Sequence, residues 1–216
     1  MLSVVFRRTK VTLGLVALFS MVSLLSMFSW QSAVNVLACK PGNLQHLSTW
    51  YSFVTYSWLH LIPYHLLVNS FVILLVALIV EPRLPRAKFL FLYLSAAILG
   101  GFTYSGLSEH NVSFIGSAFV INAFQGVLIS CWLKNRRDFN RIETVYAYIL
   151  MAGSVSSVLL LLYSYLVGST HGLGSAATIK LISFAYGVLY GLLMPGIPST
   201  VMNDSEHGDN QPINSD

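Results

Sequence analysis

A histidine and an asparagine inside a long apolar segment are the first residues whose types suggest chemistry. His65 and Asn69 lie four positions apart, so on a helix they share one face, about one turn from each other. His60 comes just before this segment. Polar groups in lipid are costly unless they find partners or water, so we expect His65 and Asn69 to point into the protein. There they either hydrogen-bond neighbouring helices or line a polar cavity.

Ser117 is the candidate nucleophile, in the run Ile-Gly-Ser-Ala at 115–118. The preceding Gly116 would let another backbone approach closely at this point. In a membrane helix a serine hydroxyl usually bonds the carbonyl one turn back, so Ser117 alone predicts only a local hydrogen bond. Nucleophilic catalysis would also require a nearby base to take the hydroxyl proton.

The composition indicates which solvent surrounds these residues. Charged residues make up 9% of the chain, against about 25% in a typical soluble domain, and hydrophobic residues make up 55%. A spanning helix needs about 20 mostly apolar residues. Six windows meet this condition, at 11–30, 61–80, 89–107, 112–133, 144–167 and 176–194. The sequence therefore predicts an all-α, polytopic membrane protein with six transmembrane helices.

The basic residues predict the topology of these windows. Ten of the twelve Lys and Arg residues lie in three segments, which precede the first window, join the second to the third and join the fourth to the fifth. With six spans these segments fall on one side, and the positive-inside rule makes that side, with both termini, cytoplasmic. Because the basic residues flank apolar runs and do not line one polar face, the net charge of +4 does not indicate nucleic-acid binding.

The first window could instead be a signal peptide, because basic residues precede it. Its apolar stretch, however, is longer than the usual length of about 7–15 residues, and no clear A-x-A site follows. Residues 1–197 are therefore expected to form one membrane domain. Residues 198–216, with four acidic residues among Asn, Ser and Gly, are expected to form a disordered cytoplasmic tail.

Two further features bound the function. Segment 31–60 is too polar to span and is rich in aromatic residues, which places it at the headgroup level. Of the six histidines only His60 and His65 are close in sequence, without a nearby carboxylate or cysteine. No metal site is predicted, and without a glycine-rich nucleotide loop no cofactor is predicted either.

The polar residues resemble a motif of the rhomboid family, the six-helix intramembrane serine proteases. His60, His65 and Asn69 match the family pattern H-x-x-x-x-H-x-x-x-N at all three polar positions. Glu81 lies where rhomboids commonly have a glutamate, and Ser117 follows it at about the family's distance. The number and order of the predicted helices also agree with this family.

The resemblance implies a role for each of these residues. Ser117 would attack a scissile carbonyl within the membrane, and His65, Asn69 and the Ser117 amide, next to Gly116, would stabilise the oxyanion. A histidine on the sixth span would be the general base, giving a Ser–His dyad without an acidic third member. The partners would be the lipid bilayer and transmembrane helices of other membrane proteins, which would unwind as substrates into a site open to water.

The similarity covers residues 50–137 well and departs from the family pattern in three places. Rhomboids carry G-x-S-G at the nucleophile, whereas an alanine follows Ser117 here. The segment 50–55 is similar to the family's W-R-x-x-T but has Tyr51 and Ser52 in place of its arginine. The third departure concerns the general base.

Gly187 and Gly191 fit the family's H-x-x-G-x-x-x-G in the last helix, which puts Phe184 at the position of the catalytic histidine. Phenylalanine cannot accept a proton. His171, in a glycine-rich segment before the same helix, also begins an H-x-x-G run and is the candidate base for Ser117. A straight helix would place His171 about 35 Å from the far end of the last window, at the outer surface.

Three interpretations stay open at this point. The first is an intramembrane serine protease with an atypical dyad of Ser117 and His171. The second is a rhomboid-like pseudoprotease that binds transmembrane helices without cutting them, which keeps His65 and Asn69 in a polar cavity and explains Phe184. The third is an unrelated small membrane protein, although a transporter would more often show broken helices or paired halves.

Overall fold

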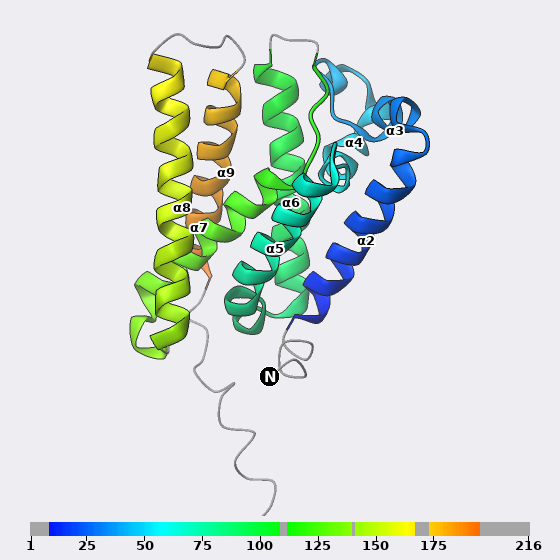
Figure 1. The fold of residues 1–216 in the computed structure, drawn as a ribbon. Coiled ribbons are helices and arrows are strands. Elements are labelled where there is room, and N and C mark those ends of the chain that lie inside the picture. Colours follow the sequence, from blue (N-terminus) through cyan, green and yellow to red (C-terminus); the bar gives the residue numbers. More distant parts are fainter. Residues whose placement is uncertain (1–8, 109–111, 140, 167–172, 195–216) are drawn as a thin grey trace, which may run out of the picture.

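The computed structural model describes residues 9–108, 112–139, 141–166 and 173–194 of the chain (Figure 1). Its helices are α2 (Lys10–Met27), α3 (Trp30–Leu37), α4 (Ser52–Thr55), α5 (Pro63–Val80), α6 (Arg86–Leu107), α7 (Ala118–Lys134), α8 (Arg141–Leu166) and α9 (Leu173–Leu193). Five single 3₁₀ turns are η1 (Asn43–Gln45), η2 (Leu47–Thr49), η3 (Tyr56–Trp58), η4 (Glu81–Arg83) and η5 (Arg136–Asp138). The prediction of an all-α protein is confirmed for this part of the chain.

Three helical segments among the described residues are long and apolar enough to cross a bilayer, judged by length and composition. They are Lys10–Met27, Pro63–Arg83 and Arg86–Leu107. Two further apolar helices, Ala118–Lys134 and Thr178–Leu193, are shorter. These segments support the prediction of an integral membrane protein with several spans.

The start of α7 differs from the sequence prediction. The fourth apolar window begins at residue 112, whereas the helix begins at Ala118. Before it, Phe114 and Cys39 exchange two backbone hydrogen bonds, of 2.7 and 3.1 Å, and the amide of Gly116 donates to the carbonyl of Tyr56 at 2.9 Å. These tertiary bonds satisfy the backbone groups that a helix would otherwise pair, so an extended segment precedes α7.

Helix α7 lies in the middle of the bundle and packs against α5, α6, α8 and α9 (Figure 1). Its contact with α9 is especially close. A Cβ on Gly187 would collide with the carbonyl of Ala123, and a Cβ on Gly126 would collide with the carbonyl of Phe184. Small residues of this kind let membrane helices approach backbone to backbone. The absence of a side chain at Gly187 therefore lets α9 pack directly against the helix that follows Ser117.

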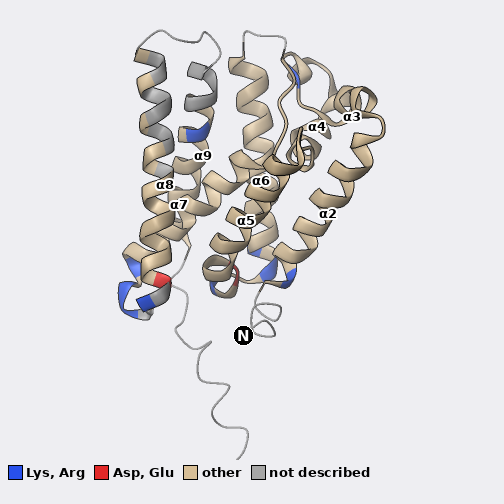
Figure 2. Ribbon diagram, viewed as in Figure 1, with Lys and Arg blue, Asp and Glu red and all other residues tan. Residues whose placement is uncertain are grey.

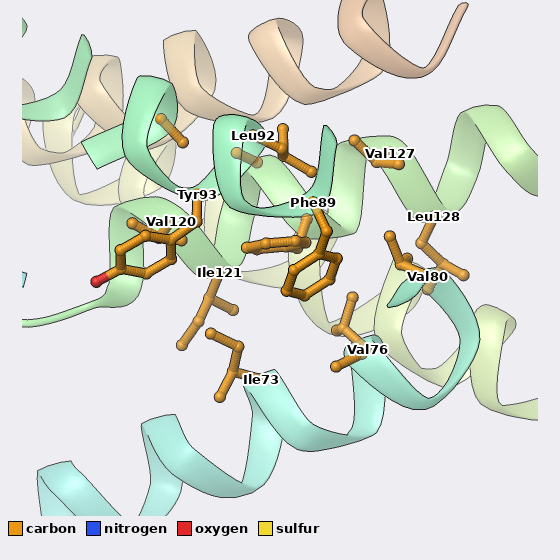
Figure 3. Packing of buried hydrophobic residues seen from close by; sticks show 14 of the residues in the cluster. Ile73, Val76, Val80, Phe89, Leu92, Tyr93, Val120, Ile121, Val127 and Leu128 are labelled. Carbon is orange, nitrogen blue, oxygen red and sulfur yellow. The ribbon is translucent and has the colours of Figure 1, made fainter. Parts of the chain in front are cut away.

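The apolar core lies between α5, α6 and α7. Figure 3 shows side chains of these three helices pointing toward one another, among them Val76 of α5, Phe89 of α6 and Val127 of α7. The ring centroids of Phe89 and Phe124 are 4.7 Å apart. Lipid tails are as apolar as these side chains, so the packing is stabilised chiefly by van der Waals contact.

The carboxylate of Glu81 joins α2 to the end of α5. Glu81 is buried and accepts hydrogen bonds from the backbone amides of Val11 (2.8 Å) and Thr12 (3.0 Å) and from the Thr12 hydroxyl (2.6 Å). The two amides belong to the first turn of α2, where no intrahelical acceptor is available and where the helix dipole favours a negative charge. This contact holds the first turn of α2 against the end of α5.

Most described Lys and Arg residues gather at one end of the bundle (Figure 2). This is the end where α2 begins, where α5 passes into α6 and where α7 passes into α8 (Figure 2). Arg83 forms a salt bridge of 2.9 Å with Glu143 there and lies 4.3 Å above the ring centre of Phe139. The described residues of the three basic segments thus lie at the same end of the helices, which is what the topology prediction requires.

Candidate active site

Ser117 stands at the junction between the extended segment and α7. Its backbone, with φ of −86° and ψ of 4°, forms the N-cap of α7, and its carbonyl accepts the amide of Ile121 at 3.0 Å. The preceding Gly116 has φ of +99°, a conformation that L residues with a side chain rarely adopt. The glycine therefore makes the sharp turn that presents Ser117 at the start of a buried helix.

His65 and Asn69 of α5 lie beside this turn. A Cβ on Gly116 would lie 3.0 Å from Cε1 of His65 and 3.9 Å from Nδ2 of Asn69. The sequence suggested that Gly116 would allow a backbone to approach; the groups next to it are instead the side chains of His65 and Asn69. The structure thus brings four of the sequence-predicted residues together: Gly116, Ser117, His65 and Asn69.

The side-chain amide nitrogen of Asn69, Nδ2, is buried without a hydrogen-bond partner among the described residues. An unsatisfied buried donor costs about 1–3 kcal/mol, so native proteins rarely retain one without a functional reason. Nδ2 of Asn69 lies near Gly116, one residue before Ser117. An oxygen atom held at this point would satisfy the donor.

A second imidazole, that of His60, contacts Ser117 directly. Nε2 of His60 lies 3.2 Å from Oγ of Ser117, across 57 residues of sequence. On the other side of the ring, Nδ1 lies 3.2 Å from Oγ of Ser23, whose hydroxyl donates to the carbonyl of Trp58 at 2.9 Å. His60 and Ser117 are both fully buried, so neighbouring side chains must move before a substrate reaches the serine.

Burial determines the charge of His60, which lies between η3 and α5. Desolvation, and in second place the charge of His65, lower the pKa of His60 to about 4, and a hydrogen bond with the backbone of Trp58 opposes this only in part. The ring centroids of His60 and His65 are 5.2 Å apart. His60 is therefore a neutral imidazole at pH 7, able to accept a proton.

The last helix brings a phenylalanine to this level of the bundle. Ser183 of α9 is buried and its hydroxyl donates to the carbonyl of Phe119, in the first turn of α7. Phe184 follows it, partly buried, at the position where the family pattern has a histidine. His171, the base suggested by the sequence, lies outside the described residues.

Two contributions were missed by sequence reasoning. His60 was recognised as part of a motif but received no role, because it precedes α5 and helical spacing says nothing of its direction. Ser23 is one of several serines in α2, and another of them, Ser26, simply bonds the carbonyl of Val22 one turn back. Nothing in the sequence around Ser23 distinguishes it from such a residue.

The described residues contain no group of three His, Cys, Asp or Glu side chains that could hold a metal ion. What they do contain is a hydroxyl, a neutral imidazole and an unused amide donor within one buried site. These are the groups needed for attack of a serine on a carbonyl and for stabilisation of the resulting oxyanion.

A comparison with known families identifies the family of this chain. The family model described as the Rhomboid domain matches residues 47–197, which is more than half of the chain and includes Ser117, His60, His65 and Asn69. No curated protein matches the chain. Rhomboids are an intramembrane protease-like family that acts on membrane proteins within the bilayer. The extent of the match, together with the apolar helices, establishes that this chain belongs to the rhomboid family.

Proposed function

We propose that this protein is an intramembrane serine protease of the rhomboid type, with Ser117 as its nucleophile. One observation carries the proposal: the buried hydroxyl of Ser117 lies 3.2 Å from an imidazole nitrogen of His60, close to the unpartnered amide of Asn69. A nucleophile needs a base to remove its proton, and the developing oxyanion needs donors already in place.

The proposed architecture is a six-span bundle formed by residues 1–197. Helices α2 and α5 to α9 cross the bilayer, and the acidic residues 198–216 form a cytoplasmic tail. The end of the bundle that carries the basic segments faces the cytoplasm, together with both termini. The lipid bilayer is thus the environment in which Ser117 works.

The oxyanion site consists of Asn69, His65 and the backbone amide of Ser117. The first amides of a helix have no intrahelical acceptor, and the helix dipole favours a negative charge near them. Gly116 keeps the space between this turn and α5 open, because any side chain there would meet His65. An oxyanion formed on attack by Ser117 would accept hydrogen bonds from these groups.

The substrates are transmembrane helices of other membrane proteins, which unwind locally to offer a peptide carbonyl to Ser117. The reaction uses water and requires no cofactor. Phe184 occupies the family position of the base, and His171, in the segment before the last helix, stays a candidate for that role if it reaches the serine. The identity of the base can be separated experimentally from the identity of the nucleophile.

Labelling with a fluorophosphonate probe tests the nucleophile. Purified protein in detergent is expected to become covalently labelled at one residue, identified by mass spectrometry as Ser117, and Ser117→Ala is expected to abolish the label. Ser95→Ala is the matched control, because the hydroxyl of Ser95 bonds the carbonyl of Phe91 within α6 and the hydroxyl of Tyr186 on α9, and neither partner belongs to the proposed site. If the wild-type protein stays unlabelled while an active rhomboid reacts in the same detergent, the protease proposal fails.

A second candidate function is a rhomboid-like pseudoprotease that binds transmembrane helices without cutting them. Phe184 favours it, because this residue occupies the family's position for the catalytic histidine and cannot accept a proton. Under this hypothesis wild-type protein and Ser117→Ala would capture the same membrane helices by crosslinking, and neither would react with the probe. Probe labelling at Ser117 excludes it.

A further inference from the structure

We propose that His60 is the general base that takes the proton of Ser117, held in the required tautomer by Ser23 of α2. The inference rests on the proposed function, because it assumes that Ser117 is a nucleophile. It places the base at the start of α5 and not on the last helix, where Phe184 stands.

The distance between His60 and Ser117 permits proton transfer. Nε2 of His60 and Oγ of Ser117 are 3.2 Å apart, within reach of a hydrogen bond and of direct proton transfer. Phe19 of α2 covers the imidazole, with ring centroids 6.3 Å apart, and His60 has no exposed surface. The imidazole is therefore fixed at the nucleophile by packing as well as by hydrogen bonds.

The directions of the hydrogen bonds around Ser23 determine the tautomer of His60. A carbonyl oxygen can only accept, so the Ser23 hydroxyl donates its single proton to the carbonyl of Trp58. Oγ of Ser23 is then an acceptor for Nδ1 of His60, which must carry the ring proton. In a neutral imidazole the other nitrogen is an acceptor, so Nε2 presents its lone pair to the hydroxyl of Ser117.

This chain of bonds occupies the place that an acidic residue has in a three-membered catalytic site. The Ser23 oxygen stabilises the proton on Nδ1 when the imidazole becomes charged, and the Trp58 carbonyl polarises the Ser23 hydroxyl. The Ser23 hydroxyl and the Trp58 carbonyl are both neutral, so the stabilisation is weaker than that from a carboxylate. Ser23 is thus a positioning residue, while His60 touches the reacting oxygen.

The proton movements balance. When Oγ of Ser117 bonds to the scissile carbonyl carbon, its proton passes to Nε2 of His60 and the carbonyl oxygen becomes the oxyanion. When the C–N bond breaks, Nε2 returns that proton to the leaving amine. Water then attacks the acyl-serine ester and gives a proton to Nε2, and Ser117 recovers it as the Oγ–C bond breaks. No reactant other than water is required.

The experiment compares rates of fluorophosphonate labelling at Ser117 in the wild type, His60→Gln and Ser95→Ala. Glutamine keeps a polar atom near the position of Nε2 but cannot take a proton. His60→Gln is expected to lower the rate by about 100- to 10,000-fold, while Ser95→Ala is expected to match the wild type. Thermal unfolding in detergent checks that each variant is folded, and His60→Asn, which retains a donor for Ser23, replaces His60→Gln if that variant is not.

The outcomes separate the two proposals. Wild-type labelling at Ser117 with His60→Gln within threefold of it would keep the protease and overturn His60 as base; His171→Ala would then test the other candidate. Loss of labelling in folded His60→Gln supports the proposal when the wild-type rate also falls through an acid limb at or below the ordinary range for histidine, the direction in which burial moves the pKa of His60. Loss of labelling in this variant with a wild-type rate that shows no acid limb would make His60 a structural residue, and an unlabelled wild type would overturn both proposals.

Discussion

Gly116 faces the imidazole of His65, and a Cβ on this glycine would lie 3.0 Å from Cε1 of that ring. Gly116→Ala should therefore reduce both the stability of the protein and the reactivity of Ser117. The φ of +99° is strained for alanine by about 1–2 kcal/mol, and the new methyl group pushes His65 away from the oxyanion site. We expect a lower thermal unfolding midpoint and loss of labelling at Ser117.

A matched substitution separates the strain from the collision. Gly42 also has a positive φ, of +83°, but nothing lies within 4 Å of its Cβ position. Gly42→Ala should reduce stability by a similar amount and leave labelling unchanged. If Gly116→Ala retained wild-type labelling, Gly116 would be a structural glycine without a role in the site.

The unpartnered amide of Asn69 predicts opposite effects on stability and reactivity. Asn69→Ala removes a buried donor that has no partner among the described residues, so the unfolding midpoint should stay unchanged or rise. The same substitution removes a proposed oxyanion donor and should slow labelling at Ser117 by about 100- to 1,000-fold. The two quantities are measured on the same preparation.

Ser70 supplies the control for Asn69. Its hydroxyl is also buried without a partner among the described residues, on the next position of α5. Ser70→Ala should leave both stability and labelling close to wild type. A parallel loss of stability and labelling in Asn69→Ala would show that the Asn69 side chain stabilises the helix bundle and is not reserved as an oxyanion donor.

The pH dependence of labelling should have its acid limb well below the usual range for histidine. Burial, with a smaller contribution from the charge of His65, lowers the pKa of His60 to about 4. Only neutral His60 accepts the Ser117 proton, so the rate is full above the folded pKa and falls as the pH drops through about 4. Lys180 of α9 interacts electrostatically with the neighbouring His65.

The carboxylate of Glu81 should stabilise the docking of α2. Glu81→Gln removes a charge at the first turn of α2 and at least one of three hydrogen bonds, so unfolding should become easier by about 1–2 kcal/mol. Thr12→Val removes only the hydroxyl bond and should cost less. Thermal unfolding in detergent measures both, and an unchanged midpoint in Glu81→Gln would contradict this role.

The long helices could be predicted from the sequence because lipid imposes one rule on every span. A run of about 20 apolar residues must pair its backbone internally, and the predicted windows each overlap a long helix. The rule failed where the backbone found partners elsewhere. The segment before α7 is apolar enough to be helical, yet Gly116 and Phe114 bond to Tyr56 and Cys39 instead.

The sequence could predict that two site residues lie together only where both belong to the same helix. His65 and Asn69 lie on the same face of α5, and spacing alone reveals that relationship. Among the aromatic residues of the segment 31–60, Phe53 and Tyr56 are buried inside the protein, the latter donating to the carbonyl of Ala97, whereas Trp50 and Tyr51 are exposed. The partners of such side chains come from distant segments, and neither composition nor period contains that information.

The hydrogen bond between Ser23 and His60 shows that residues before the Rhomboid match contribute to the proposed site. The Rhomboid match starts at residue 47, so a fragment cut at that boundary would contain Ser117, His60, His65 and Asn69 yet lack all of α2. Such a fragment would expose the buried imidazole of His60 and remove the Ser23 oxygen that fixes its tautomer. It would also leave the carboxylate of Glu81 without the three hydrogen bonds that it accepts from α2. A minimal protein that preserves the chemistry must therefore be longer than the part that sequence similarity delimits.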